Sequence, residues 1–120
     1  MNRHITVKEL PKGGPYSHAV VSGNLVFVSG QTGQIPDRAT EFEEQFNNAM
    51  ARIKKILEEA GSSIDRVIKV SVYLARSSDF EKMNELFEKY FGRDPPARTT
   101  LVTGFVVSGI LVEIDVIASK

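Results

Sequence analysis

Near its C-terminus the chain carries two strand-like segments, Pro-Pro-Ala-Arg-Thr-Thr-Leu at residues 95–101 and Leu-Val-Glu-Ile-Asp-Val-Ile at residues 111–117. Each places a charged side chain, Arg98 or Glu113, among residues typical of buried β-structure. Charged side chains are rarely fully buried unless they are paired or used. An arginine can hold a carboxylate through two hydrogen bonds, and a glutamate beside it can move a proton or orient a water molecule. The two segments therefore predict a site for a small molecule that carries a carboxylate group.

Two helices are predicted, at residues 40–60 and 79–91, because apolar side chains recur there with helical spacing. Each is expected to begin at a capping box and to end at a glycine. The residues concerned are Thr40, Glu43 and Gly61 for the first helix, and Ser78, Glu81 and Gly92 for the second.

Six strands are predicted from alternating or β-branched residues, at 4–8, 19–21, 25–29, 67–75, 97–103 and 110–118. The order β-β-β-α-β-α-β-β predicts a single domain over residues 1–120, a two-layer α/β sandwich with two helices on one face of a mixed sheet. In the last strand, the even-numbered residues from Val112 to Ala118 are expected to lie under the helices. The other face is half apolar but carries Glu113 and Asp115, so we expect it to be covered by oligomerisation.

The composition narrows the function classes. Fifteen basic and fifteen acidic residues give a formal net charge of +0, with no basic stripe, so nucleic-acid binding is not predicted. There is no cysteine, and His4 and His18 lack metal-ligand spacing, so neither a thiolate nucleophile nor a metal site is expected. No apolar signal region and no long apolar run is present, which predicts a soluble cytoplasmic protein.

Five further residues are candidates for the site: Tyr16, Ser29, Gly30, Asn84 and Thr100. Each also has an ordinary structural explanation, such as packing, a strand-end turn or an amide that borders an apolar helix face. Two structural alternatives stay open for the charged residues: an ion pair between Arg98 and Glu113 or another acid, or a surface position for Glu113. A lone loop histidine, His18, is more typical of an incidental residue than of a base.

The motifs occur in an order that resembles the RidA family of enamine and imine deaminases, from about residue 4 to residue 119. They are Gly14-Pro15-Tyr16-Ser17, Phe27-Val28-Ser29-Gly30-Gln31, Ile68-Lys69-Val70-Ser71-Val72-Tyr73-Leu74, Met83-Asn84, Pro96-Ala97-Arg98 and Val112-Glu113-Ile114. The resemblance implies a chorismate-mutase-like fold and a homotrimer around a central barrel, with sites in clefts between subunits. It also implies a reaction that needs no cofactor.

The resemblance further implies roles for individual residues. Arg98 would bind the substrate carboxylate and Glu113 would position or activate water. Tyr16, Ser29 and Asn84 would line the cleft, with backbone supplied by Gly30. Thr100 stands where many members have a cysteine, and residues 104–109 lack the family's common Leu-Pro-Lys-Asp, so both bear on substrate fit.

The implied function is hydrolysis of reactive 2-enamine or 2-imine acids, of the 2-aminoacrylate and 2-aminocrotonate type, to 2-keto acids and ammonia. Two alternatives remain from other function classes. One is a non-catalytic trimeric binder or sensor of small keto acids, and the other is a ribonuclease or translation inhibitor. Retention of Glu113 favours the enzyme, because a binder of carboxylates gains little from a nearby acid.

Overall fold

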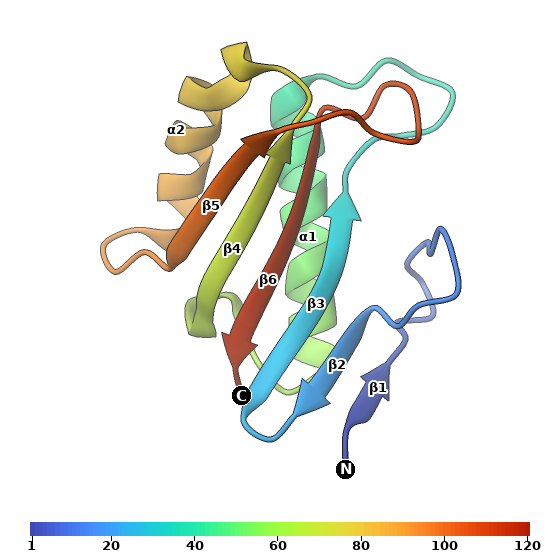
Figure 1. Ribbon diagram of the computed structural model, residues 1–120, viewed down its shortest axis with the longest axis vertical. Coiled ribbons are helices and arrows are strands. Elements are labelled where there is room, and N and C mark those ends of the chain that lie inside the picture. The colour runs from blue at the N-terminus through green and yellow to red at the C-terminus, as the bar shows by residue number, and fades with distance from the viewer.

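The computed structural model describes residues 1–120 and contains one six-stranded sheet with two helices (Figure 1). The strands are β1 (Arg3–Ile5), β2 (Ala19–Ser22), β3 (Leu25–Thr32), β4 (Val67–Leu74), β5 (Ala97–Val102) and β6 (Val112–Ser119), and the helices are α1 (Phe42–Glu59) and α2 (Phe80–Phe91). Short 3-10 turns precede β4 (Ile64–Arg66) and α2 (Ser77–Asp79). The predicted α/β architecture and element order are confirmed.

The strands lie in the order β1-β2-β3-β6-β4-β5. Neighbouring strands are antiparallel except β4 and β5, which are parallel because α2 crosses over between them. The last strand of the sequence, β6, therefore lies in the middle of the sheet (Figure 1). As a result, Glu113 lies on a central strand and Arg98 on an edge strand, with β4 between them.

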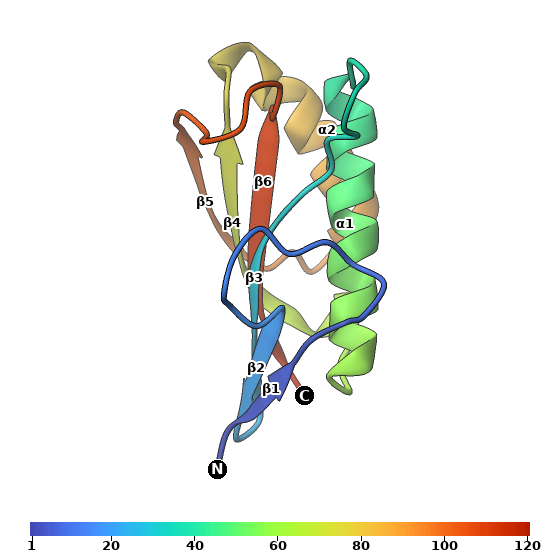
Figure 2. The same ribbon diagram turned by 90° about the vertical axis from the view of Figure 1, so that its right-hand side faces the viewer.

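The two helices cover the same face of the sheet and leave the other face open (Figure 2). The strand β6 shows the alternation that this requires: its even-numbered residues Val112 to Ala118 are at most 1% exposed, as predicted. The odd-numbered Glu113, Asp115 and Ile117 are only half-buried. One strand thus supplies both the core and the open face.

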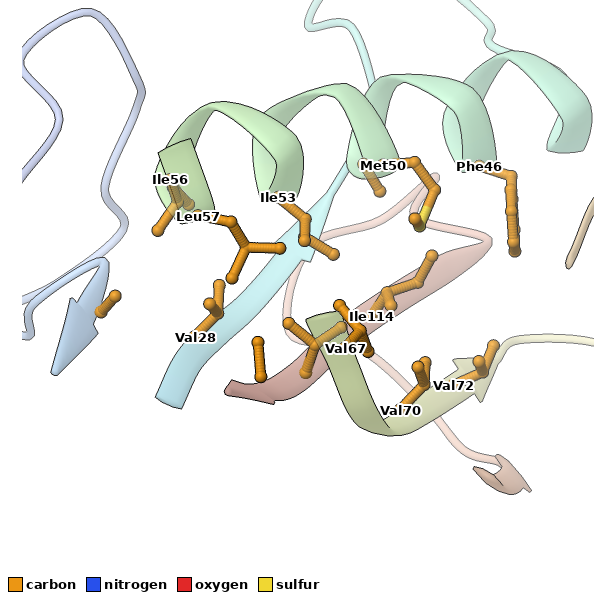
Figure 3. Packing of buried hydrophobic residues seen from close by; sticks show 14 of the residues in the cluster. Val28, Phe46, Met50, Ile53, Ile56, Leu57, Val67, Val70, Val72 and Ile114 are labelled. Atoms are coloured by element: carbon orange, nitrogen blue, oxygen red, sulfur yellow. The ribbon is translucent and has the colours of Figure 1, made fainter. Parts of the chain in front are cut away.

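The core lies between the sheet and the apolar side of α1 (Figure 3). The helix side chains Phe46, Met50, Ile53 and Leu57 point toward the strands and are at most 1% exposed. At about 25 cal/mol per Å² of apolar surface removed from water, this layer is the main source of folding free energy. It fixes α1 rigidly over the sheet, and with it every polar side chain that α1 carries at its border.

The predicted capping box of the first helix is wrong. The N-cap is Glu41, whose side chain forms no capping hydrogen bond. The hydroxyl of Thr40 instead accepts a hydrogen bond from the Ile35 amide and donates one to the Arg38 carbonyl, which folds the preceding loop. Local bonds of this kind compete with capping for the same hydroxyl.

The predicted capping box of the second helix is also wrong, because Ser78 lies within a 3-10 turn and Asp79 takes the N-cap position without a side-chain bond. The predicted glycine stops are confirmed. Gly61 and Gly92 have positive φ angles of 85° and 54°, which glycine adopts without steric cost.

The strand β3 is longer than predicted and irregular. It continues to Thr32, and its register against β6 shifts between Val28 and Gln31, where three steps along β3 match two steps along β6. Such a bulge bends a strand and re-aims its side chains. Here the bulge falls at Ser29 and Gly30, two of the candidate site residues. The first strand, predicted at 4–8, is confined to Arg3–Ile5.

Candidate functional site

Most of the residues predicted for the site line one of two separate hollows of the chain, whereas Ser29 and Thr100 line neither. The first, about 350 Å³, brings together Tyr16, Gly30 and Glu113 with the loop residues Val107 and Ile110. The second, about 370 Å³, lies at the edge of the sheet. Its lining includes Asn84, Phe87, Pro95, Pro96 and Arg98.

Gly30 allows the Glu113 carboxylate to lie directly against the backbone of β3. A Cβ atom added to Gly30 would collide with the carboxylate of Glu113. The absence of a side chain at residue 30 therefore places Glu113, rather than merely tolerating a turn. This close approach follows from the bulge, and it sets the acid at the wall of the first hollow.

The environment of Glu113 favours its protonated form. Partial burial raises the pKa of the Glu113 carboxyl above its ordinary value, and the negative charge of Asp115 on the same face raises it further. No basic side chain forms an ion pair with Glu113. A carboxyl whose pKa moves toward neutral pH is suited to accept and return a proton.

Tyr16 and Ser29 are held in place by hydrogen bonds to the backbone. The Tyr16 hydroxyl accepts a hydrogen bond from the Gly13 amide at 3.0 Å, and the residue remains 42% exposed. The Ser29 hydroxyl, at the bulge of β3, donates to the Ser17 carbonyl at 2.7 Å. Tyr16 is thus preorganised in the hollow that contains Glu113, and Ser29 ties β3 to the segment that follows Tyr16.

His18 has a structural role. It is 1% exposed; its Nδ1 accepts a hydrogen bond from the Val7 amide at 2.9 Å, and its Nε2 lies 3.0 Å from the Pro11 carbonyl. An accepting Nδ1 requires the neutral tautomer with hydrogen on Nε2, which donates to Pro11. The ring therefore braces the loop between β1 and β2, to which both Val7 and Pro11 belong, and it has no nitrogen free for proton transfer.

Arg98 lies in the second hollow, on the helix side of β5. Its guanidinium carbon is 4.8 Å from the ring centre of Phe87 and 5.8 Å from that of Phe80, both on α2. These cation–π contacts orient the group without using its hydrogen-bond donors. Arg98 forms no ion pair with any acid of the chain, so the alternative of an internal pair with Glu113 or Asp115 is not observed.

The expected proximity of Arg98 and Glu113 does not occur within one chain. Arg98 packs against α2, whereas Glu113 alternates with buried residues and lies on the open face. Since β4 also separates their strands, the two groups cannot meet without another molecule or subunit. The internal ion pair between Arg98 and Glu113, one of the alternatives left open by the sequence, is therefore not formed within one chain.

The remaining predicted residues belong to the half that contains Arg98. Asn84 is an exposed residue of α2 at the wall of the hollow. Thr100 follows Arg98 on the same side of β5, and its buried hydroxyl oxygen has no hydrogen-bond partner. Unpaired buried hydroxyls are uncommon in native proteins.

One residue of the first hollow escaped the sequence interpretation. Arg52, on α1, lines it with Glu113. Its Nη1 donates to the Thr32 carbonyl at 2.6 Å, and partial burial lowers the pKa of its guanidinium. The available signal was its spacing, three residues after Ala49 and four before Ile56, which places it at the border of the apolar helix face.

Other site classes find little support. No group of three or more His, Cys, Asp or Glu side chains is brought together in the structure. Neither helix combines the length and apolar character that crossing a membrane requires. The two hollows contain, respectively, a carboxyl group with a raised pKa and a guanidinium without an acidic partner.

The six-stranded mixed sheet, the two helices on one face and the divided arginine and glutamate define an α/β protein of the chorismate-mutase-like fold. The family model described as endoribonuclease L-PSP matches residues 6–120. The chain therefore belongs to the YjgF/RidA/L-PSP family, as predicted from its motifs.

Relatives and a solved structure support this assignment. A RutC family protein of Pyrococcus abyssi is 40% identical over 97% of this chain and 95% of its own length. The chloroplastic Reactive Intermediate Deaminase A of Arabidopsis thaliana is 34% identical over 88% of this chain and 59% of its own length. The crystal structure of RidA from an Antarctic Psychrobacter superposes with a TM-score of 0.89 at 34% identity, covering 98% of this chain and 99% of that one.

Proposed function

We propose that the protein hydrolyses reactive 2-enamine and 2-imine acids to 2-keto acids and ammonia. The observation that carries this proposal is the state of Arg98: an oriented guanidinium, in a hollow, with no acidic partner in its chain. Such a group is suited to bind a substrate carboxylate in a two-bond grip. The deaminase named among the relatives supports the same reaction class.

The proposal requires that the chain act as a homotrimer. The hollow that contains Glu113 in one subunit would meet the hollow that contains Arg98 in its neighbour. Together they would complete a site that neither chain contains alone. Exposed apolar side chains on the strands support such an assembly, because the helices leave the other face of the sheet uncovered. They include Leu25, Phe27, Ile68 and Leu101.

In the proposed reaction, Arg98 holds the carboxylate and Glu113 of the neighbouring subunit faces the imine carbon. The imine reacts in its N-protonated form. Glu113 takes a proton from water as the water oxygen bonds to that carbon, which gives a neutral carbinolamine. Glu113 then passes this proton to the amino nitrogen, and the C–N bond breaks with release of ammonia as the carbonyl forms and the hydroxyl proton moves to Glu113. The imine is already electrophilic, so positioning and proton transfer suffice, the latter contributing about 10²–10⁴-fold in general.

The other candidate residues have positioning roles in this scheme. Tyr16, Ser29 and the backbone of Gly30 would shape the wall around the acid, and Asn84 and Thr100 the wall around the arginine. The unpaired Thr100 hydroxyl is available to a ligand in a way that a cysteine thiol, a weak donor, is not. The cytoplasmic location stays a prediction.

A coupled assay tests the function. A serine/threonine dehydratase generates 2-aminoacrylate or 2-aminocrotonate, and keto-acid formation is followed with and without this protein. We expect wild-type protein to accelerate it and Arg98→Ala to lose about 10²–10⁴-fold, the value of two hydrogen bonds to a charged group. Arg66→Ala is the matched control, because Arg66 is exposed, unpaired and outside both hollows.

Three results would contradict the proposal. Full activity of Arg98→Ala would exclude the carboxylate grip. Full activity of a protein that sedimentation shows to be a monomer under the assay conditions would exclude the shared site. If a well-folded trimer binds 2-oxobutanoate but gives no acceleration, the keto-acid sensor would be favoured instead. In that case Glu113→Gln should bind 2-oxobutanoate as tightly as wild type.

The ribonuclease alternative has a weaker physical basis in this chain. Several of its cations are already paired with acids: Arg38 with Glu44, Lys55 with Glu9, Arg76 with Asp79, and Lys82 with Glu43. The formal net charge is +0. Binding to RNA that survives moderate salt would support this alternative, since contacts to phosphates weaken steeply as salt rises.

A further inference from the structure

Arg52 is a half-buried cation without an acidic partner. It projects from α1, which the core holds rigidly over the sheet. Of its five donors, one at Nη1 bonds the Thr32 carbonyl at 2.6 Å, and no carboxylate lies within ion-pair distance. A partly desolvated charge that lacks a counter-charge is costly unless a ligand supplies one.

Arg52 and Glu113 belong to the same hollow although they come from opposite layers of the molecule. Arg52 reaches the end of β3, where Gly30–Thr32 extend beyond the pairing with β2, which stops at Val28. Thr32 in turn lies directly across from Glu113 in the register of β3 and β6. The open end of β3 thus brings the helix cation and the strand acid to the wall of one hollow of about 350 Å³.

Arg52 is the only cationic side chain in the lining of this hollow. Each nearby amide has one donor already used: Gln34 donates to the Ser108 carbonyl at 2.9 Å and Gln31 to the Ser29 carbonyl at 3.2 Å. Of the lining side chains, Arg52 therefore offers an anionic group both a positive charge and several free N–H donors. A single carbonyl bond uses little of a guanidinium, whose fork matches a carboxylate.

We propose that Arg52 binds a second anionic group of the substrate, so that the site prefers 2-imino acids carrying a side-chain carboxylate. The proposal rests on the proposed function. Arg98 of one subunit would hold the carboxylate beside the imine carbon, that carbon would face Glu113, and the side-chain carboxylate would extend to Arg52. The acids that supply such substrates are the dicarboxylic amino acids, oxidised at the C–N bond.

The first test is binding, which does not depend on turnover. Calorimetry compares 2-oxoglutarate with 2-oxobutanoate, which differ in the second carboxylate. We expect wild-type protein to bind 2-oxoglutarate more tightly, and Arg52→Gln to weaken that binding about 10- to 100-fold while 2-oxobutanoate changes less than about twofold. The glutamine can still donate to the Thr32 carbonyl, so the variant removes the charge and keeps a donor.

Two further variants separate charge from structure. Arg52→Lys keeps the charge without the fork and should retain part of the preference. Lys54→Met removes an exposed charge from the same helix, outside the hollow, and should leave both affinities unchanged. Arg52→Gln could lower the unfolding temperature. In that case, the ratio of the affinities for 2-oxoglutarate and 2-oxobutanoate in Arg52→Lys still measures what the planar guanidinium contributes beyond its charge.

The second test is turnover. An amino-acid oxidase generates the imine of glutamate or of 2-aminobutanoate, and kcat/KM is compared for the two. We expect Arg52→Gln to lower kcat/KM for the dicarboxylate imine selectively, chiefly through KM. Equal effects on both imines, or none on either, would overturn the proposal. The two proposals can also fail separately. If the protein hydrolyses no imine, but Arg52→Gln selectively weakens binding of 2-oxoglutarate, the anion site at Arg52 is supported and the deaminase function is refuted.

Discussion

The two faces of the sheet differ in what their side chains do. The face under α1 and α2 is apolar except on the edge strand β5, where Arg98 and Thr100 face α2, and its residues on β6 are almost completely buried. The open face mixes acids with exposed apolar side chains such as Phe27 and Ile68. The period-2 geometry of a strand allows one sequence to serve both purposes. The comparison teaches that the helix-covered face supplies most of the stability and carries Arg98 only at its edge strand, while Glu113 and the exposed apolar side chains occupy the other face.

The largest expected effect comes from breaking the helix-covered face. Ile53 is completely buried between α1 and the strands (Figure 3). We expect Ile53→Ala to lower the free energy of unfolding by about 2–5 kcal/mol, through lost burial and the cavity left behind. Urea denaturation at a fixed protomer concentration measures this change.

Phe27→Ala is the matched truncation on the open face. Because Phe27 is 42% exposed in the isolated chain, its loss should cost the folded chain little and the proposed trimer much. Sedimentation should show dissociation with the helical circular-dichroism signal retained. An intact trimer with reduced chain stability would reverse the assignment of the two faces.

A second pair of substitutions compares Gly33, which lies against α1, with Gly30, which lies against Glu113. A Cβ on Gly33 would collide with the backbone carbonyl of Gln45 on α1, which cannot move without shifting the helix. We expect Gly33→Ala to cost roughly 1–3 kcal/mol of stability, as overpacking does. Thermal and urea unfolding measure the loss.

Gly30→Ala should affect activity instead. The three atoms nearest to its added Cβ, namely Oε2, Cδ and Cγ, all belong to the side chain of Glu113, which can rotate away. We expect stability within about 1 kcal/mol of wild type and a fall in kcat of at least about 100-fold, as for a displaced catalytic acid. Equal kcat in Gly30→Ala and wild type would show that the Glu113 position does not matter.

The parts of the fold that a local period encodes could be predicted from the sequence. The alternation from Val112 to Ala118 and the apolar face of α1 are patterns of two and 3.6 residues, and both are found as expected. The capping boxes failed because Thr40 bonds to its own loop and Ser78 lies within a 3-10 turn. Both outcomes depend on chain paths outside the motif.

The arrangement of the site depends on long-range placement that no short motif contains. The position of β6 between β3 and β4 separates Arg98 from Glu113, and strand order is set by the whole sheet. The residues themselves could be selected because charges in strand-like segments demand an explanation. Arg52 could not be selected in this way, since a cation at the border of an apolar helix face is common. Its position becomes informative only through its contact with Thr32 at the end of β3.

The smallest expected effect tests how the open face controls its own acid. The charge of Asp115 is the second cause, after burial, that raises the pKa of Glu113. If deprotonated Glu113 is the active form, kcat rises with pH through that raised pKa, above the ordinary carboxyl range near pH 4.3. Asp115→Asn removes a charge that favours the protonated form, so we expect this acidic limb to move to lower pH.

The same shift has a defined sign in stability. Because the folded state raises the pKa of Glu113, its contribution is fully present below the unfolded pKa and is lost as pH rises through the folded one. Asp115→Asn should reduce that loss, so its stability gain over wild type should be larger at neutral pH than at pH 4. Glu59→Gln, which removes an exposed acid outside both hollows and outside every ion pair, is the control. A kcat profile that moves equally in both variants, or that moves upward in Asp115→Asn, would show that the limb belongs to a group other than Glu113.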